Sequence, residues 1–266
     1  MYGVVTRNES ELSRSVFDRT MYEVKDVTGR RAEPVAGSTS MLSCFGDNRA
    51  VEQDPSLVPV SDAEEPATRE RTYFDWDYVC PSASDYCDQL LTRIKEVVAV
   101  TEDIRIDDVG FPREEYCYCD RCQEVFAENE IDDWWDWRVS VITDFVADVR
   151  ELVPGRLSMT LYPDPYPGHL RRRTGIDLDA LAAHVDEFVV PLYDMAYETT
   201  YWLEIIAMGF EDALTVPFSI ELYAVNVDDE NLAHAAEVAD EYADSVLFAY
   251  DAGTASEVIE QLHESA

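Results

Sequence analysis

Basic residues are scarce in this sequence, and lysine is almost missing. The 266 residues include two lysines and eighteen arginines against 56 Asp and Glu, which gives a formal net charge of −36. Contacts to phosphate require clustered Lys and Arg side chains, so this balance excludes non-specific binding to nucleic acid. An anionic membrane surface would repel the chain for the same reason. We therefore expect neither a nucleic-acid partner nor a membrane partner.

Long apolar runs are missing as well. No stretch of 18 apolar residues occurs, which argues against a membrane-spanning helix. The first residues, MYGVVTRNESEL, lack the basic and apolar segments of a signal peptide, so the expected location is the cytoplasm. Residue 2 already opens an expected strand, which leaves open whether a further segment precedes it. With 47% apolar residues the chain can still bury a sizeable core.

Acidic residues dominate the charged positions. A carboxylate-rich and lysine-poor composition is typical of haloarchaeal-type proteins from a salt-saturated cytoplasm, where salt screens the self-repulsion of the chain. Most of the Asp and Glu residues then serve solvation. The functional carboxylates must be identified by their position in the fold.

Short apolar runs alternate with longer helical patterns along the chain. The runs are nearly continuous, which is typical of parallel strands covered on both faces. Eight such runs favour an α/β fold, a (β/α)8 TIM barrel in which residues 1–266 form a single domain. A doubly wound open sheet is the alternative, but no Gly-rich phosphate loop follows the first strand. The expected strands cover residues 2–6, 32–36, 72–78, 104–109, 157–162, 188–193, 217–223 and 246–250. The expected helices cover residues 9–27, 84–99, 120–151, 176–186, 199–212, 229–243 and 254–264.

The stretch 37–70 has little periodicity and is rich in Ser, Pro, Asp and Glu. We expect a long loop there, after the second strand. Long loops on the C-terminal side of barrel strands often form the rim of an active site, and a solvated insertion is the alternative interpretation.

Acidic and aromatic residues follow the expected strands, at the ends where barrel enzymes carry their sites. Such residues suit a neutral, polyhydroxylated ligand, so a small carbohydrate is the expected partner. A phosphorylated ligand would need basic residues, and the three arginines at 171–173 either serve this purpose or balance nearby acids. The oligomeric state, including a homo-oligomer, stays open. The candidate substrate-binding residues are Asp164, His169, Tyr193, Asp194, Tyr223 and Asp251.

The most specific local motif is C-x-C-x-x-C over residues 117–122. Three thiols this close cannot all pair with one another, and a cytosolic chain is not expected to hold disulfides. Closely spaced thiolates suit a tetrahedral Zn²⁺ site, which needs a fourth ligand. Cys80 is the best candidate, because the loops after neighbouring strands meet. Cys87 and Cys44 are the alternatives.

The residues DDVG at 107–110, followed by the cysteine motif and Phe126, resemble the fourth-strand region of glycoside hydrolase family 42 β-galactosidases. They also resemble related hypothetical glycosyl hydrolases with α-amylase-like barrels. In the family, Asn-Glu stands where this chain has Asp107 and Asp108, and further domains are present, so the substrate does not transfer. Some family members bind a structural zinc through four cysteines. The resemblance therefore implies a structural zinc held by Cys80, Cys117, Cys119 and Cys122.

Glycoside hydrolysis requires two carboxyl groups that flank the scissile bond. Barrels of this superfamily take them from strands four and seven, which implies Asp108 as acid/base and Glu221 as nucleophile or base. Asp107 is a further candidate, since repulsion between adjacent acids raises one pKa, which suits an acid. A charge at Glu221, within an apolar run, needs a compensating contact. The alternative is therefore that Glu221 only pairs with Arg105.

Other catalytic motifs are missing from the sequence. There is no G-x-S-x-G, no H-E-x-x-H and no Walker loop. We expect a glycoside hydrolase with the carboxyl pair above. Two hypotheses of other classes remain: a barrel that binds or isomerises a carbohydrate without hydrolysis, and a degenerate barrel that serves as an interaction protein.

Overall fold

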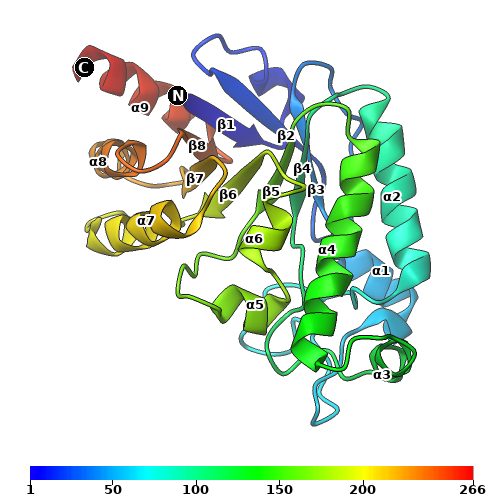
Figure 1. Ribbon diagram of the computed structural model, residues 1–266. Coiled ribbons are helices and arrows are strands. Elements are labelled where there is room, and N and C mark those ends of the chain that lie inside the picture. Colours follow the sequence, from blue (N-terminus) through cyan, green and yellow to red (C-terminus); the bar gives the residue numbers. More distant parts are fainter. Residues whose placement is uncertain (266) are drawn as a thin grey trace.

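The structure is a computed structural model and describes residues 1–265. Eight parallel strands form a closed barrel, in which each strand pairs with the next in chain order and β8 pairs with β1. Figure 1 shows the barrel with its helices packed around the outside. This arrangement confirms the predicted (β/α)8 TIM barrel. The strands are β1 (Tyr2–Thr6), β2 (Arg19–Lys25), β3 (Thr39–Ser43), β4 (Ile104–Asp107), β5 (Leu157–Thr160), β6 (Glu187–Pro191), β7 (Phe218–Tyr223) and β8 (Ser245–Ala249).

Helices cover the barrel from β3 onward. The two longest, α2 and α4, pack side by side on its outer face, and α9 returns the chain to β1 and β8 (Figure 1). Among the described residues, no helix has the length and apolar character needed to cross a membrane. The α-helices are α1 (Asn48–Gln53), α2 (Ser84–Val98), α3 (Asp120–Ala127), α4 (Trp134–Leu152), α5 (His169–Thr174), α6 (Leu178–Leu181), α7 (Tyr201–Ala213), α8 (Asp229–Asp240) and α9 (Ala252–Ser265), with 3-10 turns at Glu9–Glu11 and Pro55–Leu57.

The second and third strands differ from the sequence prediction. β2 lies inside the expected helix 9–27, and β3 lies inside the expected loop 37–70. The runs at 32–36 and 72–78, which were predicted as strands, belong to irregular segments instead. The number of strands was therefore correct, but two of the eight were assigned to the wrong residues.

The physical reason lies in the inner face of β2. Every second residue from Arg19 to Glu23 points into the barrel, and a register shift follows before Lys25. Arg19 pairs with Glu187 inside the barrel, Glu23 with Arg7 at its mouth, and Lys25 with Asp47 in the loop after β3. An alternation of polar and apolar residues is a strand pattern, but it is not the continuous apolar run that usually marks a buried parallel strand. The long loop consequently begins after β3 and extends to α2.

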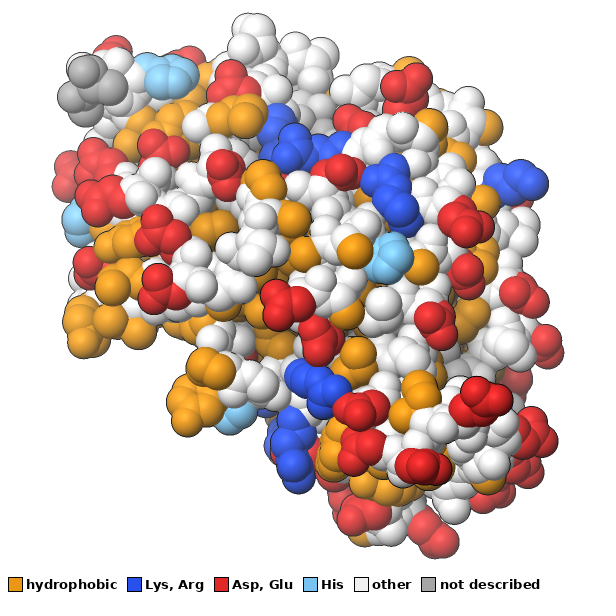
Figure 2. All heavy atoms as spheres, viewed as in Figure 1, with side chains coloured by type: hydrophobic (Ala, Val, Ile, Leu, Met, Phe, Trp, Pro, Cys, Tyr) orange, Lys and Arg blue, Asp and Glu red, His pale blue; other side chains and the backbone are white. Residues whose placement is uncertain are grey.

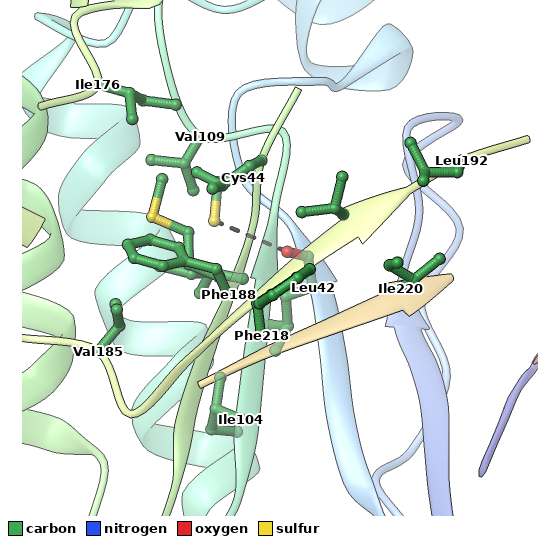
Figure 3. Packing of buried hydrophobic residues seen from close by; sticks show 14 of the residues in the cluster. Leu42, Cys44, Ile104, Val109, Ile176, Val185, Phe188, Leu192, Phe218 and Ile220 are labelled. Atoms are coloured by element: carbon green, nitrogen blue, oxygen red, sulfur yellow. Dashed lines mark hydrogen bonds between the residues drawn. The ribbon is translucent and has the colours of Figure 1, made fainter. Parts of the chain in front are cut away.

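The main core lies between the strands and the surrounding helices. Figure 3 shows side chains of β4, β6 and β7 packed against residues of the connecting segments, including Ile104, Phe188 and Ile220. Cys44 lies in the same cluster and is fully buried, with its Sγ 3.7 Å from the carbonyl oxygen of Leu42. Cys44 is therefore a small core residue.

The interior of the barrel is arranged in layers. Its apolar middle layer consists of six residues that form a separate cluster. At the N-terminal end, the fully buried Glu187 carboxylate binds Arg19 with two bonds of 2.7 Å and also accepts from Ser158 at 3.1 Å. At the C-terminal end the polar residues described in the next subsection gather. The apolar layer consists of Val5, Met21, Met41, Val189, Leu247 and Ala249.

Candidate functional site

Arg105 occupies the centre of the C-terminal end of the barrel. It lies on β4, and its side chain is almost completely buried. The guanidinium group forms ion pairs with Glu221 on β7 and with Asp107, where the Nη2–Oδ1 distance is 3.3 Å. Its Nε donates to Thr160 on β5 at 2.9 Å. One arginine thus joins three strands and holds two carboxylates at the mouth of the barrel.

Glu221 is shielded from solvent. Its side chain has no exposed surface, since it lies on the inner face of β7 with Arg105 on one oxygen and Tyr193 on the other. The Tyr193 hydroxyl donates to Oε1, while Tyr193 itself is 44% exposed. The contact with Arg105 is the pairing that the sequence suggested as an alternative to catalysis. Tyr193 covers Glu221 on the side of the open mouth.

The two adjacent acids at the end of β4 have different surroundings. Asp107 follows Arg105 by two residues, so its side chain also points into the barrel. Burial raises the pKa of Asp107 to about 7; Arg105 opposes this increase, and the charges of Asp108 and Glu221 add to it. Asp108 leaves the strand with a φ of 53° and places Oδ2 2.5 Å from the Ser43 hydroxyl. Burial raises the pKa of Asp108 as well, and the Ser43 contact opposes this.

Glu23, on β2, also belongs to the mouth, although the sequence interpretation missed it. It forms an ion pair with Arg7, and its Oε1 lies 3.3 Å from the Tyr250 hydroxyl. Its charge contributes to the raised pKa of Asp107. The missed signal was the alternating pattern of residues 19–25, which was read as part of a helix.

A second buried ion pair lies beside the mouth. Lys25 Nζ is 3.0 Å from Asp47 Oδ2 and donates to the Ser43 carbonyl oxygen at 2.8 Å. Both charges are nearly excluded from solvent, and Asp47 also accepts from the Tyr86 hydroxyl at 3.0 Å. All polar partners are satisfied, so this pair fixes the segment after β3 against β2.

The remaining predicted substrate-binding residues lie in the loops around the mouth. Asp164 binds His169 through Nδ1 at 3.0 Å, and the His169 side chain is more than half exposed. Asp194 accepts from the backbone N–H of residue 196 in a short turn. The Tyr223 ring packs on Tyr193 with a centroid distance of 5.5 Å.

Asp251 has a local structural contact. Its Oδ1 accepts from the backbone N–H groups of Gly253 and Thr254 at 2.9 and 3.1 Å, at the start of α9. Such a bond satisfies N–H groups that a helix leaves without partners in its first turn. The predicted ligand residues therefore do not form one set: Tyr193 contacts Glu221 directly, whereas Asp251 caps a helix.

Four cysteines come together from the two loops after β3 and β4. The Sγ atoms of Cys80, Cys117, Cys119 and Cys122 all lie within 4.8 Å of one another. The Cys80–Cys122 and Cys80–Cys119 distances are 3.3 and 3.8 Å. Four thiolates around one Zn²⁺, with Zn–S bonds of about 2.3 Å, lie about 3.8 Å apart. The donor set and its spacing therefore fit a tetrahedral zinc site.

The other two cysteines are not part of this cluster. Cys87 Sγ lies 3.3 Å from the Pro81 carbonyl oxygen, and Cys44 packs in the core. A cleft of about 970 Å³ adjoins the cysteine cluster on its outer side and is lined by residues such as Tyr118 and Trp134. The predicted catalytic carboxylates do not line this cleft, so it is separate from the mouth of the barrel.

The fold of this chain is similar to the barrels of several solved glycoside hydrolases. No protein-family model matches the chain, and no curated protein matches it. An alpha-L-fucosidase from Paenibacillus thiaminolyticus has a TM-score of 0.67 at 12% identity, over 99% of this chain and 48% of the fucosidase. A GH18 chitinase from Cycas revoluta gives a TM-score of 0.56 at 10% identity and 99% coverage of both chains. An alpha-amylase from Lactobacillus plantarum gives 0.51 at 11% identity, over 95% of this chain and 70% of the amylase.

At such low identities the likeness shows the fold alone. The chain is a TIM barrel whose similar solved structures include glycoside hydrolases, and it spans about half the length of the fucosidase. The sequence resemblance to family 42 in particular is not supported, because no family model matches.

Proposed function

We propose that this protein is a glycoside hydrolase acting on a small carbohydrate, with a carboxyl group of β4 and Glu221 of β7 as its catalytic pair. The observation that carries the proposal is the joint binding of Asp107 and Glu221 by the Arg105 guanidinium. Glycosidases require two carboxyl groups no more than about 9.5 Å apart. The span of one guanidinium keeps these two groups within that limit.

The acid role requires a carboxyl group that is protonated near neutral pH. Two observations support Asp107 for it ahead of Asp108. The Asp107 side chain points into the barrel beside Glu221, and its pKa is raised to about 7. Asp108 is instead bound to Ser43 at the edge of the mouth, where it increases the negative charge around Asp107. Asp107 would protonate the leaving oxygen, and Asp108 would help to keep its pKa high.

The second role requires a carboxylate that stays ionised. Glu221 would fill this role, because it forms an ion pair with the buried Arg105 guanidinium at the mouth of the barrel. Glu221 would act as nucleophile or as base toward water. The hydrogen bond from the Tyr193 hydroxyl to Oε1 would orient the Glu221 carboxylate toward the sugar. Tyr193 and Tyr223 would then form the aromatic part of the binding surface.

The four cysteines would hold a structural Zn²⁺. Four thiolate ligands leave no open coordination position for water, so the ion would tie the loop after β3 to the loop after β4 without taking part in hydrolysis. These loops carry Ser43 and Asp108 at their beginnings. The zinc site would therefore support the geometry of the mouth.

A carbohydrate-binding barrel without hydrolysis is the second candidate. The observation that favours it is the complete exclusion of Glu221 from solvent in its pair with Arg105. The two functions differ in their products, because a binding protein is stabilised by its ligand but releases no reducing sugar.

The experiment that separates them uses three variants, Glu221→Gln, Asp107→Asn and Asp108→Asn, assayed on a panel of nitrophenyl glycosides in molar KCl. Loss of an acid or base lowers the rate by about 10²–10⁴-fold. We expect losses of this size for Glu221→Gln and Asp107→Asn, while ligand-dependent thermal stabilisation persists. Glu102→Gln, an exposed position at the opposite end of β4, is the matched control. Absence of turnover by the unmodified protein would contradict the hydrolase proposal.

A further inference from the structure

Three consecutive arginines on α5 differ in their partners. Arg171 forms ion pairs with Asp136 and with Asp177, the latter at 3.2 Å. Arg172 forms an ion pair with Glu114 at 2.7 Å. These two arginines balance nearby acids, which was one of the two roles that the sequence suggested. Figure 2 shows basic side chains over α5 in the lower part of the view, with further basic groups near the top and acidic side chains spread over the surface.

Arg173 has no such partner. Within residues 1–265, no carboxylate lies within ion-pairing distance of its guanidinium group, and its buried Nε has no hydrogen-bond acceptor. Of the three arginines of α5, it is the one without a carboxylate beside it. An arginine without a carboxylate beside it retains its full capacity to bind an anion.

The Arg173 guanidinium lies at the rim of the barrel mouth. Its CZ atom stacks 4.4 Å above the ring of Tyr162, which follows β5, and Tyr162 is half exposed. Both side chains act electrostatically on Tyr78, as does the charge of Asp108. Because Tyr162 follows the end of β5, the stacked Arg173 lies at the C-terminal end of the barrel, the same end at which Asp107 and Asp108 lie.

Hydrogen bonds from the Arg138 side chain fix the backbone at Arg173. The fully buried Arg138 donates to the carbonyl oxygens of Arg172 and Arg173 at 2.7 and 3.0 Å, and to that of Arg113 at 3.0 Å. A buried cation thus fixes the end of α5 to the loop after β4. A binding group on a backbone held in this way loses little freedom when a ligand arrives.

We propose that Arg173 binds the carboxylate of an acidic sugar, so that the ligand of this barrel is a uronic acid or a glycoside of one. This inference rests on the proposed function and specifies its substrate class; it differs from the neutral ligand that the sequence suggested. A planar guanidinium matches a carboxylate with two parallel hydrogen bonds. The Tyr162 ring packs against one face of this guanidinium.

The charge of the ligand follows from the number of cations available. A single guanidinium neutralises the one charge of a carboxylate, whereas phosphate carries nearly two charges and usually requires a second cation or several N–H groups. Arg171 and Arg172 are already paired, and Arg105 is occupied by Asp107 and Glu221. The negative field of the chain would otherwise repel an anionic sugar, which makes Arg173 decisive for its binding.

The test compares matched acidic and neutral glycosides on the same protein. Nitrophenyl glucuronides and galacturonides of both anomers are assayed beside the corresponding glucosides and galactosides. We expect a preference of at least about tenfold in kcat/KM for an acidic member. In Arg173→Gln that value should fall by about 10–100-fold, as for loss of a charged hydrogen-bond pair, while the neutral glycoside changes less than about threefold.

Two further variants make the result specific. Arg173→Lys keeps the charge but loses the paired hydrogen bonds, so its preference for the acid should be intermediate. Arg172→Gln, at the neighbouring position paired with Glu114, should leave the preference unchanged. Thermal melting of each variant establishes that the fold is intact. Turnover of neutral glycosides without any preference for acidic ones would overturn the inference and leave the hydrolase proposal standing.

Calorimetry decides the case in which no glycoside is hydrolysed. Sodium glucuronate and sodium galacturonate are titrated into the unmodified protein and into Arg173→Gln, with glucose and glucose 6-phosphate as comparisons. Uronate binding that Arg173→Gln abolishes would support the acidic-sugar site even though the hydrolase proposal had failed. Absence of uronate binding, or tighter binding of the phosphate, would overturn it.

Discussion

Arg105 on β4 and Glu221 on β7 form an ion pair across the interior of the barrel, and both side chains are excluded from solvent. Removing one partner leaves a buried charge without compensation, which typically lowers the free energy of unfolding by about 3–5 kcal/mol. We therefore expect Arg105→Met to lower the urea midpoint strongly and to abolish activity. Replacing both partners, Arg105→Met with Glu221→Leu, should recover much of the lost stability.

The control for this prediction is the ion pair at the other end of the barrel. Arg19→Met breaks the contact with Glu187, which is also buried, so it should lower the urea midpoint as well. Because this pair lies at the N-terminal end, the folded variant should keep its activity and its ligand binding. If Arg105→Met were as active as Arg19→Met, Arg105 would have a structural role only.

The raised pKa of Asp107 predicts how stability depends on pH. The native protein holds a proton at Asp107 up to a pH of about 7, whereas the unfolded chain releases it near pH 4. Between these values the native state binds more protons, so the free energy of unfolding falls as the pH rises. In Asp107→Asn the number of protons released on unfolding should fall by up to about one. The free energy of unfolding should then decrease less steeply as the pH rises. Urea melts at several pH values measure it, and an unchanged slope would contradict the assignment.

The barrel could be predicted from the sequence because six of its strands lie in short runs rich in apolar residues that alternate with helical patterns. β2 and β3 could not be located in this way. β2 carries the charged residues Arg19, Glu23 and Lys25, each of which is compensated by a residue distant in sequence. The local sequence pattern does not reveal these distant partners. The charged residues of such a strand therefore resemble the residues of a solvent-exposed surface.

The candidate site was predictable to a similar degree. The acids at the mouth could be predicted because they lie at the ends of the fourth and seventh strands. The cysteine cluster could be predicted from the spacing of the C-x-C-x-x-C motif and from the meeting of loops after neighbouring strands. The choice between Asp107 and Asp108 depended on where the strand ends and turns, which the sequence does not reveal. The unpaired state of Arg173 could not be foreseen either, since it depends on which acids its neighbours bind.

Tyr193 gives a prediction about how the Glu221 carboxylate is held. Tyr193→Phe keeps the ring but removes the hydroxyl that donates to Glu221, so the carboxylate loses one of its two partners. We expect kcat to fall by about tenfold, in keeping with the loss of a hydrogen bond to a charged group, with a smaller change in KM. Tyr223→Phe is the control, because the Tyr223 ring packs against Tyr193. This variant should change kcat and KM little. Steady-state kinetics of both variants test this relation.

The charge of the chain predicts a response to salt. With a formal net charge of −36, the compact state suffers self-repulsion that a low-salt buffer does not screen. We expect the melting temperature to rise steadily from 0.1 M to molar KCl, where the Debye length falls from about 10 to about 3 Å. Sorbitol at matched osmolality separates screening from a general solute effect. A melting temperature independent of KCl would show that the acids are already neutralised within the fold.

The cysteine cluster predicts metal content and its effect on stability. We expect about one Zn²⁺ per chain by elemental analysis, with removal by a strong chelator lowering the melting temperature, because a structural metal adds its binding free energy to that of folding. Cys80→Ser and Cys122→Ser should lose the metal and melt earlier. Cys87→Ser, a cysteine outside the cluster, should keep both metal and stability. If the chelated protein retained its full melting temperature, the four thiols would be a reduced cluster and not a zinc site.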